Sequence, residues 1–152
     1  MNLPVDIKDL KDKVVVITGA GGVICSELAK AFAAAGARVA LLDLTKEKAE
    51  QFAEEIVKAG GTAKGYMANV LDKASLAECH KQILSDFGKC DILINGAGGN
   101  SCKAQTDKEY FEAGDIDGEV KSFFDLDKSG VEFVFNLNFL GTLLPTQEFA
   151  RD

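Results

Sequence analysis

The chain has 152 residues, of which 47% are hydrophobic and 27% charged, a balance that allows one buried core and no second full domain. Its formal net charge of −7 argues against a nucleic-acid partner, because proteins that bind nucleic acids concentrate Lys and Arg on one face. The four cysteines lack CxxC pairs, and no apolar run reaches membrane-spanning length. The N-terminus has acids where a signal peptide has its apolar core, so we expect a soluble, cytoplasmic protein without a membrane partner.

The first 95 residues alternate between short apolar runs and helical patterns. The run at 14–18 is rich in β-branched residues, as in a strand that is buried on both faces of a parallel sheet. Strands are expected at 14–18, 39–42, 62–68 and 91–95, and helices at 23–35, around 49–56 and from 72 to 88. This alternation predicts an α/β fold with a doubly wound parallel sheet of strand order 3-2-1-4, because successive right-handed crossovers build that order.

The regular pattern lapses after Asn95. Residues 96–128 contain glycines, acids and only weak periodicity, so we expect a long connection with one short helix near 107–113. Ser129 and Glu132 then have the spacing of a capping box. The apolar run from there to Phe149 predicts a mostly buried helix, which Pro145 kinks or breaks.

A glycine cluster follows the first predicted strand and precedes the first predicted helix. Gly19, Gly21 and Gly22 are placed so that backbone N–H groups and the helix N-terminus can approach a pyrophosphate, although turns also use glycine for steric reasons alone. Asp43 lies at the end of the second strand, where a carboxylate can accept hydrogen bonds from ribose hydroxyls. It would repel a 2′-phosphate and so favours NAD over NADP. The alternative is that Asp43 only caps the next helix.

Four segments in this order and spacing resemble the short-chain dehydrogenase/reductases. They are TGAGGVIC at 18–25, NV at 69–70, NGAG at 95–98 and NFLG at 138–141. Within the family, the long connection and the stretch FNLNFLGTLLPTQEFARD are most similar to the D-mannonate oxidoreductase (fructuronate reductase) subgroup. The resemblance implies a single NAD(P)-binding Rossmann-type domain at 1–152 that is incomplete at its C-terminus. It also implies an NAD(H)-dependent oxidoreductase that interconverts a hydroxyl and a ketone of a sugar acid or polyol, and a homo-oligomer at full length.

The resemblance also assigns roles to individual residues. Cofactor-binding roles fall on Gly19, Gly22 and Ile24 at the pyrophosphate, Asp43 at the adenosine ribose, Asn69 and Val70 at the adenine, and Asn95, Ala97 and Gly98 on the nicotinamide side. Asn138 matches the asparagine of the catalytic helix, which helps to hold the active-site water and lysine. Without the resemblance, the alternative for Asn138 is an asparagine that bonds locally within a kinked helix.

The chain departs from the family pattern at three points. The middle glycine of the turn has moved to Gly22, with Val23 after it. Cys25 stands where the family has the last glycine of the turn, and it is either a small tolerated side chain or a reactive thiol. Gly96 replaces the second asparagine of the NNAG segment. Cofactor binding is expected to survive the change at Gly96, because the role of that asparagine is to steady the neighbouring backbone.

The catalytic part of the family pattern is missing from these 152 residues. The family uses a serine, a tyrosine and a lysine four residues after that tyrosine to move the proton that accompanies hydride transfer. Tyr66 is followed by Val70 and Tyr110 by Gly114, so neither begins a YxxxK segment. We therefore expect no turnover by these residues alone. A dehydrogenase represented by part of its chain and a non-catalytic nucleotide-binding module both remain open.

No metal site is expected. His80 is the only histidine, and we interpret it as an ordinary surface or partly buried residue. The acids at 115, 117, 125 and 127 lack the order of a calcium-binding loop and indicate a solvated acidic loop.

Overall fold

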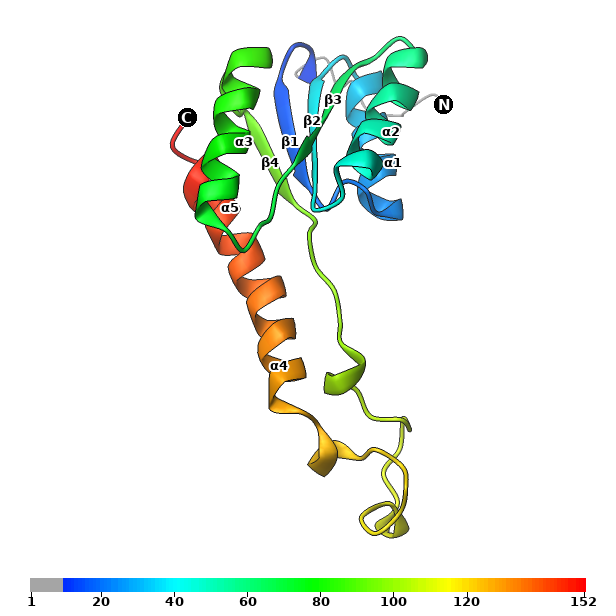
Figure 1. The fold of residues 1–152 in the computed structure, drawn as a ribbon. Coiled ribbons are helices and arrows are strands. Elements are labelled where there is room, and N and C mark those ends of the chain that lie inside the picture. Colours follow the sequence, from blue (N-terminus) through cyan, green and yellow to red (C-terminus); the bar gives the residue numbers. More distant parts are fainter. Residues whose placement is uncertain (1–9) are drawn as a thin grey trace.

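The computed structural model describes residues 10–152, and a four-stranded parallel sheet forms its centre (Figure 1). Its strands are β1 (Val14–Thr18), β2 (Arg38–Asp43), β3 (Thr62–Met67) and β4 (Ile92–Asn95). They lie in the order β3-β2-β1-β4, which confirms the predicted strand order and the Rossmann-type α/β fold.

Helices cover both faces of the sheet. On one side are α1 (Val23–Ala34) and α2 (Lys46–Lys58), and on the other are α3 (Lys73–Asp86) and α5 (Gly141–Phe149), as Figure 1 shows. Successive side chains of β1 alternate between two apolar cores, so that Val15 and Ile17 face α1 and α2 while Val14 and Val16 face α3 and α5. Between residues 10 and 152, no helix combines the length and the apolar character that crossing a membrane requires.

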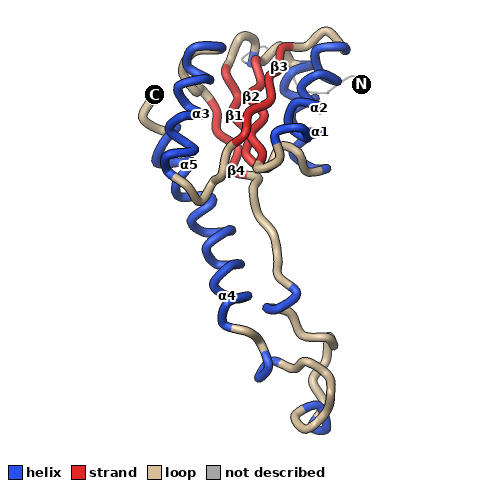
Figure 2. The backbone as a smooth tube through the Cα atoms, in the orientation of Figure 1, coloured by secondary structure: helices blue, strands red, loops and turns tan. Residues whose placement is uncertain are grey.

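Residues 96–127 leave the end of β4 and project far beyond the sheet before the chain returns in α4 (Lys128–Phe135), as Figures 1 and 2 show. We call residues 99–127 the extension. The short helix expected near 107–113 is wrong. Instead the extension contains three 3₁₀ turns: η2 (Cys102–Ala104), η3 (Ala113–Asp115) and η4 (Phe123–Asp125). Acidic and hydroxyl side chains here bond nearby backbone amides, which favours tight turns over a regular helix.

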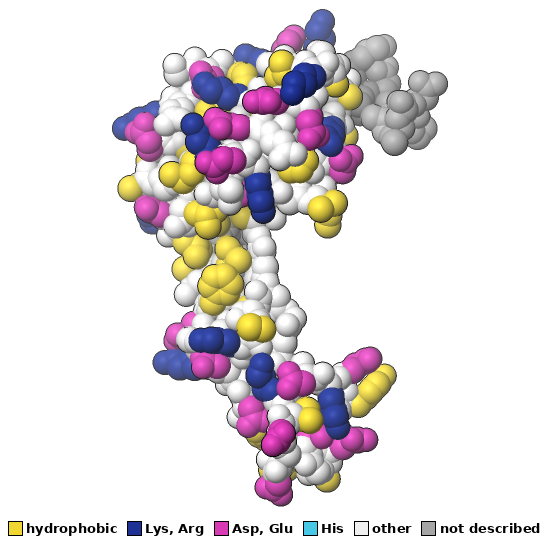
Figure 3. Space-filling view, turned by 45° about the vertical axis from the view of Figure 1, so that its right-hand side comes forward, with side chains coloured by type: hydrophobic (Ala, Val, Ile, Leu, Met, Phe, Trp, Pro, Cys, Tyr) yellow, Lys and Arg dark blue, Asp and Glu magenta, His cyan; other side chains and the backbone are white. Residues whose placement is uncertain are grey.

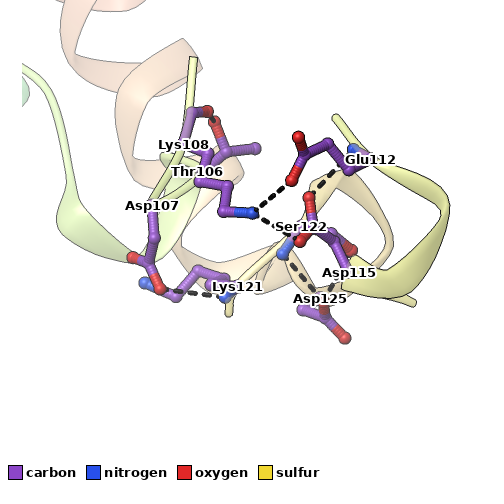
Figure 4. A network of polar contacts seen from close by, with 8 residues as sticks. All are labelled: Thr106, Asp107, Lys108, Glu112, Asp115, Lys121, Ser122 and Asp125. Carbon is purple, nitrogen blue, oxygen red and sulfur yellow. Dashed lines mark hydrogen bonds and ion pairs between the residues drawn. The ribbon is translucent and has the colours of Figure 1, made fainter. Parts of the chain in front are cut away.

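A polar network holds the outer part of the extension together (Figure 4). The Lys108 Nζ atom lies 2.8 Å from Asp115 Oδ1 and 3.0 Å from Glu112 Oε2, and the Lys121 amide donates to Asp107 Oδ2 at 2.9 Å. Asp115 is 8% exposed, so the expectation of a solvated acidic loop is wrong at this residue. The Lys108 ammonium, with the Glu112 amide, lowers the pKa of the Asp115 carboxyl.

The predicted helix from 129 to 149 forms, but in three parts. A π-helical stretch, η5 (Asn136–Leu140), separates α4 from α5 (Gly141–Phe149). Pro145 lies inside α5 without breaking it. Because proline has no N–H, the carbonyl of Gly141, four residues earlier, lacks its usual helical donor. The π-helical stretch ends directly before Gly141. Asp127 caps α4 by accepting from the Ser129 amide at 2.7 Å, so the predicted capping box of Ser129 and Glu132 is wrong.

The expectation that this helix is mostly buried is also wrong. Only α5 packs on the sheet, while α4 and η5 extend past its end. Apolar side chains therefore gather along the narrow part between sheet and extension (Figure 3), and the large exposed ones are Phe133, Phe135, Phe139 and Leu143.

A cluster of ionisable side chains fastens α5 to α3. His80 is 8% exposed, and its Nδ1 atom lies 3.0 Å from Glu148 Oε1 while its Nε2 atom lies 3.0 Å from Asp152 Oδ1. Its ring also packs on Phe149, and Asp152 Oδ2 accepts from the Cys90 amide at 2.7 Å. His80 is thus more buried and more fully bonded than the ordinary residue that we expected.

Candidate nucleotide-binding site

A cleft of about 520 Å³ opens at the carboxyl ends of the parallel strands, where ligands bind in open α/β sheets. The segments that follow all four strands contribute to it, together with α4 and η5. Its lining residues are Gly19, Gly21, Gly22, Asp43, Leu44, Lys48, Ala68, Asn69, Val70, Leu71, Gly96, Ala97, Gly98, Phe133 and Leu137.

The glycine turn forms one wall of the cleft. Gly19 has φ of +66°, and a β-carbon there would lie 2.8 Å from the backbone nitrogen and α-carbon of Ala97. A side chain at Gly19 is excluded both by its left-handed backbone and by the segment after β4. Thr18 joins the two segments, since its Oγ1 atom accepts from the amides of Gly96 at 3.1 Å and Ala97 at 3.2 Å.

Helix α1 begins at the rim of the cleft, directly after Gly22. Gly22 is its N-cap, and no side chain caps the first N–H groups of the helix. Such an N-terminus has partial positive charge and unused donors, which suits an anion. Gly19 and Gly22 line the cleft, whereas the Ile24 side chain is 77% exposed and does not. The contact of these residues with a pyrophosphate stays a prediction.

Asp43 ends β2 and faces the glycine turn. Its Oδ2 atom accepts from the Gly21 amide at 2.9 Å, and its Oδ1 atom accepts from the Thr45 amide at 2.9 Å, just before α2. The carboxylate therefore supports the local turn and also lines the cleft, but it does not cap α2, whose N-cap is Thr45. Each oxygen keeps a second lone pair for another donor.

Asn69 and Val70 follow β3 and line the same cleft. The Asn69 side chain makes a local turn, with its Oδ1 atom accepting from the Leu71 amide at 3.0 Å. The Val70 side chain is buried and supplies apolar surface, as does the neighbouring Ala68. This wall can hold a flat apolar ring.

The segment after β4 forms the opposite wall, through Gly96, Ala97 and Gly98. Asn95 stands apart from the cleft, because its Nδ2 atom donates to Thr146 Oγ1 on α5 at 3.0 Å. Its Oδ1 atom is buried and has no hydrogen-bond partner in the described part of the chain.

Asn138 lies in η5 and ties that stretch to the segment after β4. Its Nδ2 atom donates to the carbonyls of Gly99 and Val134, both at 2.8 Å, and its Oδ1 atom accepts from the Gly99 amide at 3.2 Å. Asn138 thus bonds both backbone groups of Gly99, besides the local bond within its helix. This is a positioning contact at the edge of the cleft.

Replacing Asn138 with alanine is expected to lower the free energy of unfolding by about 1–2 kcal/mol, because the Gly99 backbone loses two partners. The Gly99 amide should also exchange with solvent faster. Urea unfolding and hydrogen exchange measure the two effects. The matched control is Asn136→Ala, an exposed asparagine of the same π-helical stretch. Equal losses in the two variants would contradict the role of Asn138.

Cys25 lies in the first turn of α1 and is buried. Burial, with a smaller contribution from the Asp43 charge, raises the pKa of the Cys25 thiol. A raised pKa disfavours the thiolate, which is the reactive form. Of the two interpretations of Cys25, the geometry therefore supports the small packed side chain over the reactive thiol.

Neither tyrosine lies at the cleft. Tyr66 is buried on β3 and donates to Asp86 Oδ2 at 2.8 Å, and its burial raises the pKa of its hydroxyl. Tyr110 is 76% exposed on the extension. Neither side chain is placed to act as a proton donor beside the nucleotide wall.

Sequence reasoning missed several residues at the cleft. Lys48 comes from the first turn of α2, and Phe133 and Leu137 come from α4 and η5. Phe133 and Leu137 lie four positions apart, about one helical turn, and this spacing was their only available signal. Lys48 gave none, because it is one of several lysines on an exposed helix face.

Comparisons with known proteins agree with this geometry. A family model described as short chain dehydrogenase matches residues 13–152. An uncharacterized oxidoreductase of Haemophilus influenzae is 57% identical over 144 residues, which are 95% of this chain and 50% of that protein. An uncharacterized oxidoreductase of Bacillus subtilis is 46% identical over 145 residues, or 95% of this chain and 51% of that protein.

Among solved structures, a Haemophilus influenzae protein provisionally described as a D-mannonate oxidoreductase superposes with a TM-score of 0.90 and 55% identity. It was crystallised with bound NAD. The match covers 96% of this chain and 52% of that one. The chain therefore spans about half the length of the relatives that it matches.

Proposed function

The chain belongs to the short-chain dehydrogenase family, and we propose that it is the cofactor-binding part of an NAD(H)-dependent oxidoreductase that acts on a sugar acid or polyol. The observation that carries the proposal is the cleft at the strand ends, where a glycine turn, an uncapped helix N-terminus and a carboxylate converge. The bound NAD of the Haemophilus influenzae relative supports the choice of cofactor.

The residues of the cleft fit the parts of a dinucleotide in turn. The start of α1, directly after the glycine turn, offers uncapped backbone N–H groups and a partial positive charge to the pyrophosphate. Asp43 would accept from the adenosine ribose, and Asn69 with Val70 would flank the adenine. Ala97 and Gly98 would lie toward the nicotinamide, on the side where Asn138 fastens the backbone.

When bound, the nicotinamide ring supplies hydride transfer. The described residues contribute binding and orientation, because the cleft holds no tyrosine, histidine or serine side chain that could exchange the accompanying proton. That proton step must come from groups outside these 152 residues if the protein is a dehydrogenase. A non-catalytic nucleotide-binding module needs no such groups, and this difference separates the two candidates.

The proposed substrate class rests on the Haemophilus influenzae relative, and D-mannonate with D-fructuronate is the pair that we favour. The extension leaves from the same end of the sheet as the cleft, so it stands beside the place where a substrate would meet the nicotinamide. The interconversion would oxidise a secondary hydroxyl to a ketone with NAD, or reduce the ketone with NADH.

Binding of the cofactor is tested first, by calorimetric titration of the chain with NAD and NADP. We expect the chain to prefer NAD. Asp43→Asn should weaken NAD binding by about 10-fold, because the ribose hydroxyls lose a charged acceptor. The ratio between the affinities for NAD and NADP should also become smaller. Lys48 lies in the same cleft and would then attract the 2′-phosphate without opposition from the carboxylate.

The matched control for Asp43→Asn is Asp127→Asn. Asp127 caps α4 outside the cleft, and asparagine caps a helix about as well as aspartate, so NAD affinity should not change. Tighter binding of NADP than of NAD by the unaltered chain would show that Asp43 does not face the ribose.

Turnover is tested by joining residues 1–152 to the remaining half of the Haemophilus influenzae relative. NADH formation from NAD and D-mannonate by this chimaera, but not by residues 1–152 alone, would support the dehydrogenase. A chimaera that folds and binds NAD but turns over neither a sugar acid nor a polyol would favour the non-catalytic module.

A further inference from the structure

Two of the positions at which the chain departs from the family pattern lie against each other. Cys25 comes from the first turn of α1, and Gly96 comes from the segment after β4, 71 positions later in the sequence. A β-carbon built at Gly96 would collide with the Cys25 sulfur, while the Cys25 β-carbon lies at an ordinary 3.7 Å. Of the Cys25 atoms, only the sulfur occupies the space that a side chain at position 96 would need.

Gly96 is also held by the end of β1. Its amide donates to Thr18 Oγ1 at 3.1 Å, and the Thr18 carbonyl would lie 2.9 Å from a β-carbon at Gly96. The Gly96 backbone is thus packed between the end of β1 and the Cys25 sulfur. Since Gly96 and Ala97 line the cleft, whatever fixes this backbone also fixes a wall of the nucleotide site.

The sulfur is suited to this packing role. Cys25 is only 7% exposed, and burial together with the Asp43 charge keeps the thiol in its neutral, apolar form. Side chains in protein interiors fill space closely, so that adding or removing one heavy atom shifts the groups beside it.

We propose that Cys25 and Gly96 form a coupled pair in which the Cys25 sulfur positions the Gly96–Ala97 backbone for the cofactor. Cys25 is a positioning residue, and its sulfur acts together with the Thr18 carbonyl to exclude a side chain at position 96. This inference rests on the proposed binding of NAD and adds the pair that sets one wall of that site. Each substitution alone should therefore weaken NAD binding. The double variant should lose less affinity than the sum of the two separate losses in binding free energy.

The experiment is a double-mutant cycle on the full 152-residue chain, with Cys25→Ala, Gly96→Ala and the double variant, read by the Kd for NAD and by thermal unfolding. We expect Cys25→Ala to weaken NAD binding about 3-fold, because it leaves a small void, and Gly96→Ala to weaken it about 30-fold. The Kd of the double variant for NAD should lie within about 5-fold of that of Cys25→Ala. The remaining difference would come from the contact of the new methyl group with the Thr18 carbonyl.

The matched control replaces Cys79, which is equally buried but lies in the opposite core, on α3. Cys79→Ala should not rescue Gly96→Ala. If the effects of Cys25→Ala and Gly96→Ala simply multiply, or if Cys79→Ala rescues as well, the pair is not coupled. Rescue of the unfolding temperature alone, without rescue of NAD affinity, would limit Cys25 to a structural role and overturn the positioning role.

Two further outcomes separate a failure of folding from a failure of the proposed function. If Gly96→Ala does not fold, the proposal requires that the double variant folds and binds NAD, and an unfolded double variant overturns it. If the unaltered chain does not bind NAD, the proposed function fails. In that case a coupled effect on unfolding would still show the packing, while the positioning role falls with the function.

Discussion

Alanine at position 19 is expected to weaken NAD binding by about 100-fold and to lower the free energy of unfolding by about 3 kcal/mol. Gly19 has φ of +66°, a conformation that L side chains rarely adopt. The new methyl group would also lie 2.8 Å from the Ala97 backbone and from the Gly96 carbonyl oxygen. The chain must then separate the two walls of the cleft or change the turn, and either change moves the N–H groups at the start of α1, which we propose to bind the pyrophosphate.

The control for Gly19→Ala is Gly60→Ala. Gly60 also has a positive φ, of +89°, but apart from its two chain neighbours none of the residues 10–152 has an atom within 4 Å of its would-be β-carbon. Its substitution should cost about 1 kcal/mol of stability and leave NAD affinity unchanged. Calorimetry with NAD and urea unfolding measure both variants. If Gly19→Ala binds NAD as well as Gly60→Ala does, the close approach of the turn to Ala97 has no part in binding.

Replacing His80 with leucine is expected to lower the free energy of unfolding by about 2–3 kcal/mol, because it leaves Glu148 and Asp152 largely buried without their shared partner. Their side chains are 21% and 9% exposed. Since these contacts fasten α5 to α3, the amides of α5 should exchange faster than those of α1 in the variant. Lys81→Ala, at a neighbouring exposed residue of α3, should change stability by no more than about 0.5 kcal/mol.

The same cluster predicts a dependence on pH. Partial burial opposes ionisation of Asp152, but the Cys90 amide and the His80 ring outweigh it and hold the pKa of this carboxyl below its usual value. A depressed folded-state pKa contributes stability that is fully present above the unfolded pKa of about 3.9 and is lost as the pH falls through the folded pKa. Urea unfolding between pH 5 and pH 2.5, against Asp152→Asn, measures this term. An equal loss of stability in both proteins would show that Asp152 does not contribute.

Strands β1, β2 and β4 could be predicted from the sequence because each is built on a short apolar run between glycines or charges. The bounds of β1 at Val14–Thr18 are confirmed without change, and the other strands differ from the prediction by one or two residues at their ends. A strand buried on both faces needs side chains that are apolar on both faces, so the run itself reveals it. The extension carried no such period, and its turns depend on contacts such as that of Lys108 with Asp115, seven positions away.

The candidate site was predictable where backbone geometry determines the residue type. Gly19 must be glycine because of its positive φ, and an acid at the end of β2 is marked by its place in the chain. The side-chain environments were not predictable. Asn138 bonds Gly99 across 39 positions and His80 bonds Asp152 across 72, and only the folded chain brings such groups together.

By itself, the sequence determined the order of strands and helices, the strand order of the sheet and the glycine turn, because these follow from local periodicity and from the handedness of crossovers. The tertiary structure decided which departures from the family pattern belong together. Cys25 and Gly96 read as two separate changes along the chain, and only packing shows that a single sulfur atom fills the space that glycine leaves. The tertiary structure also decided that the large apolar side chains of α4 and η5 are exposed. An apolar run shows only that a helix can be buried, because burial also requires a neighbouring element to pack against it.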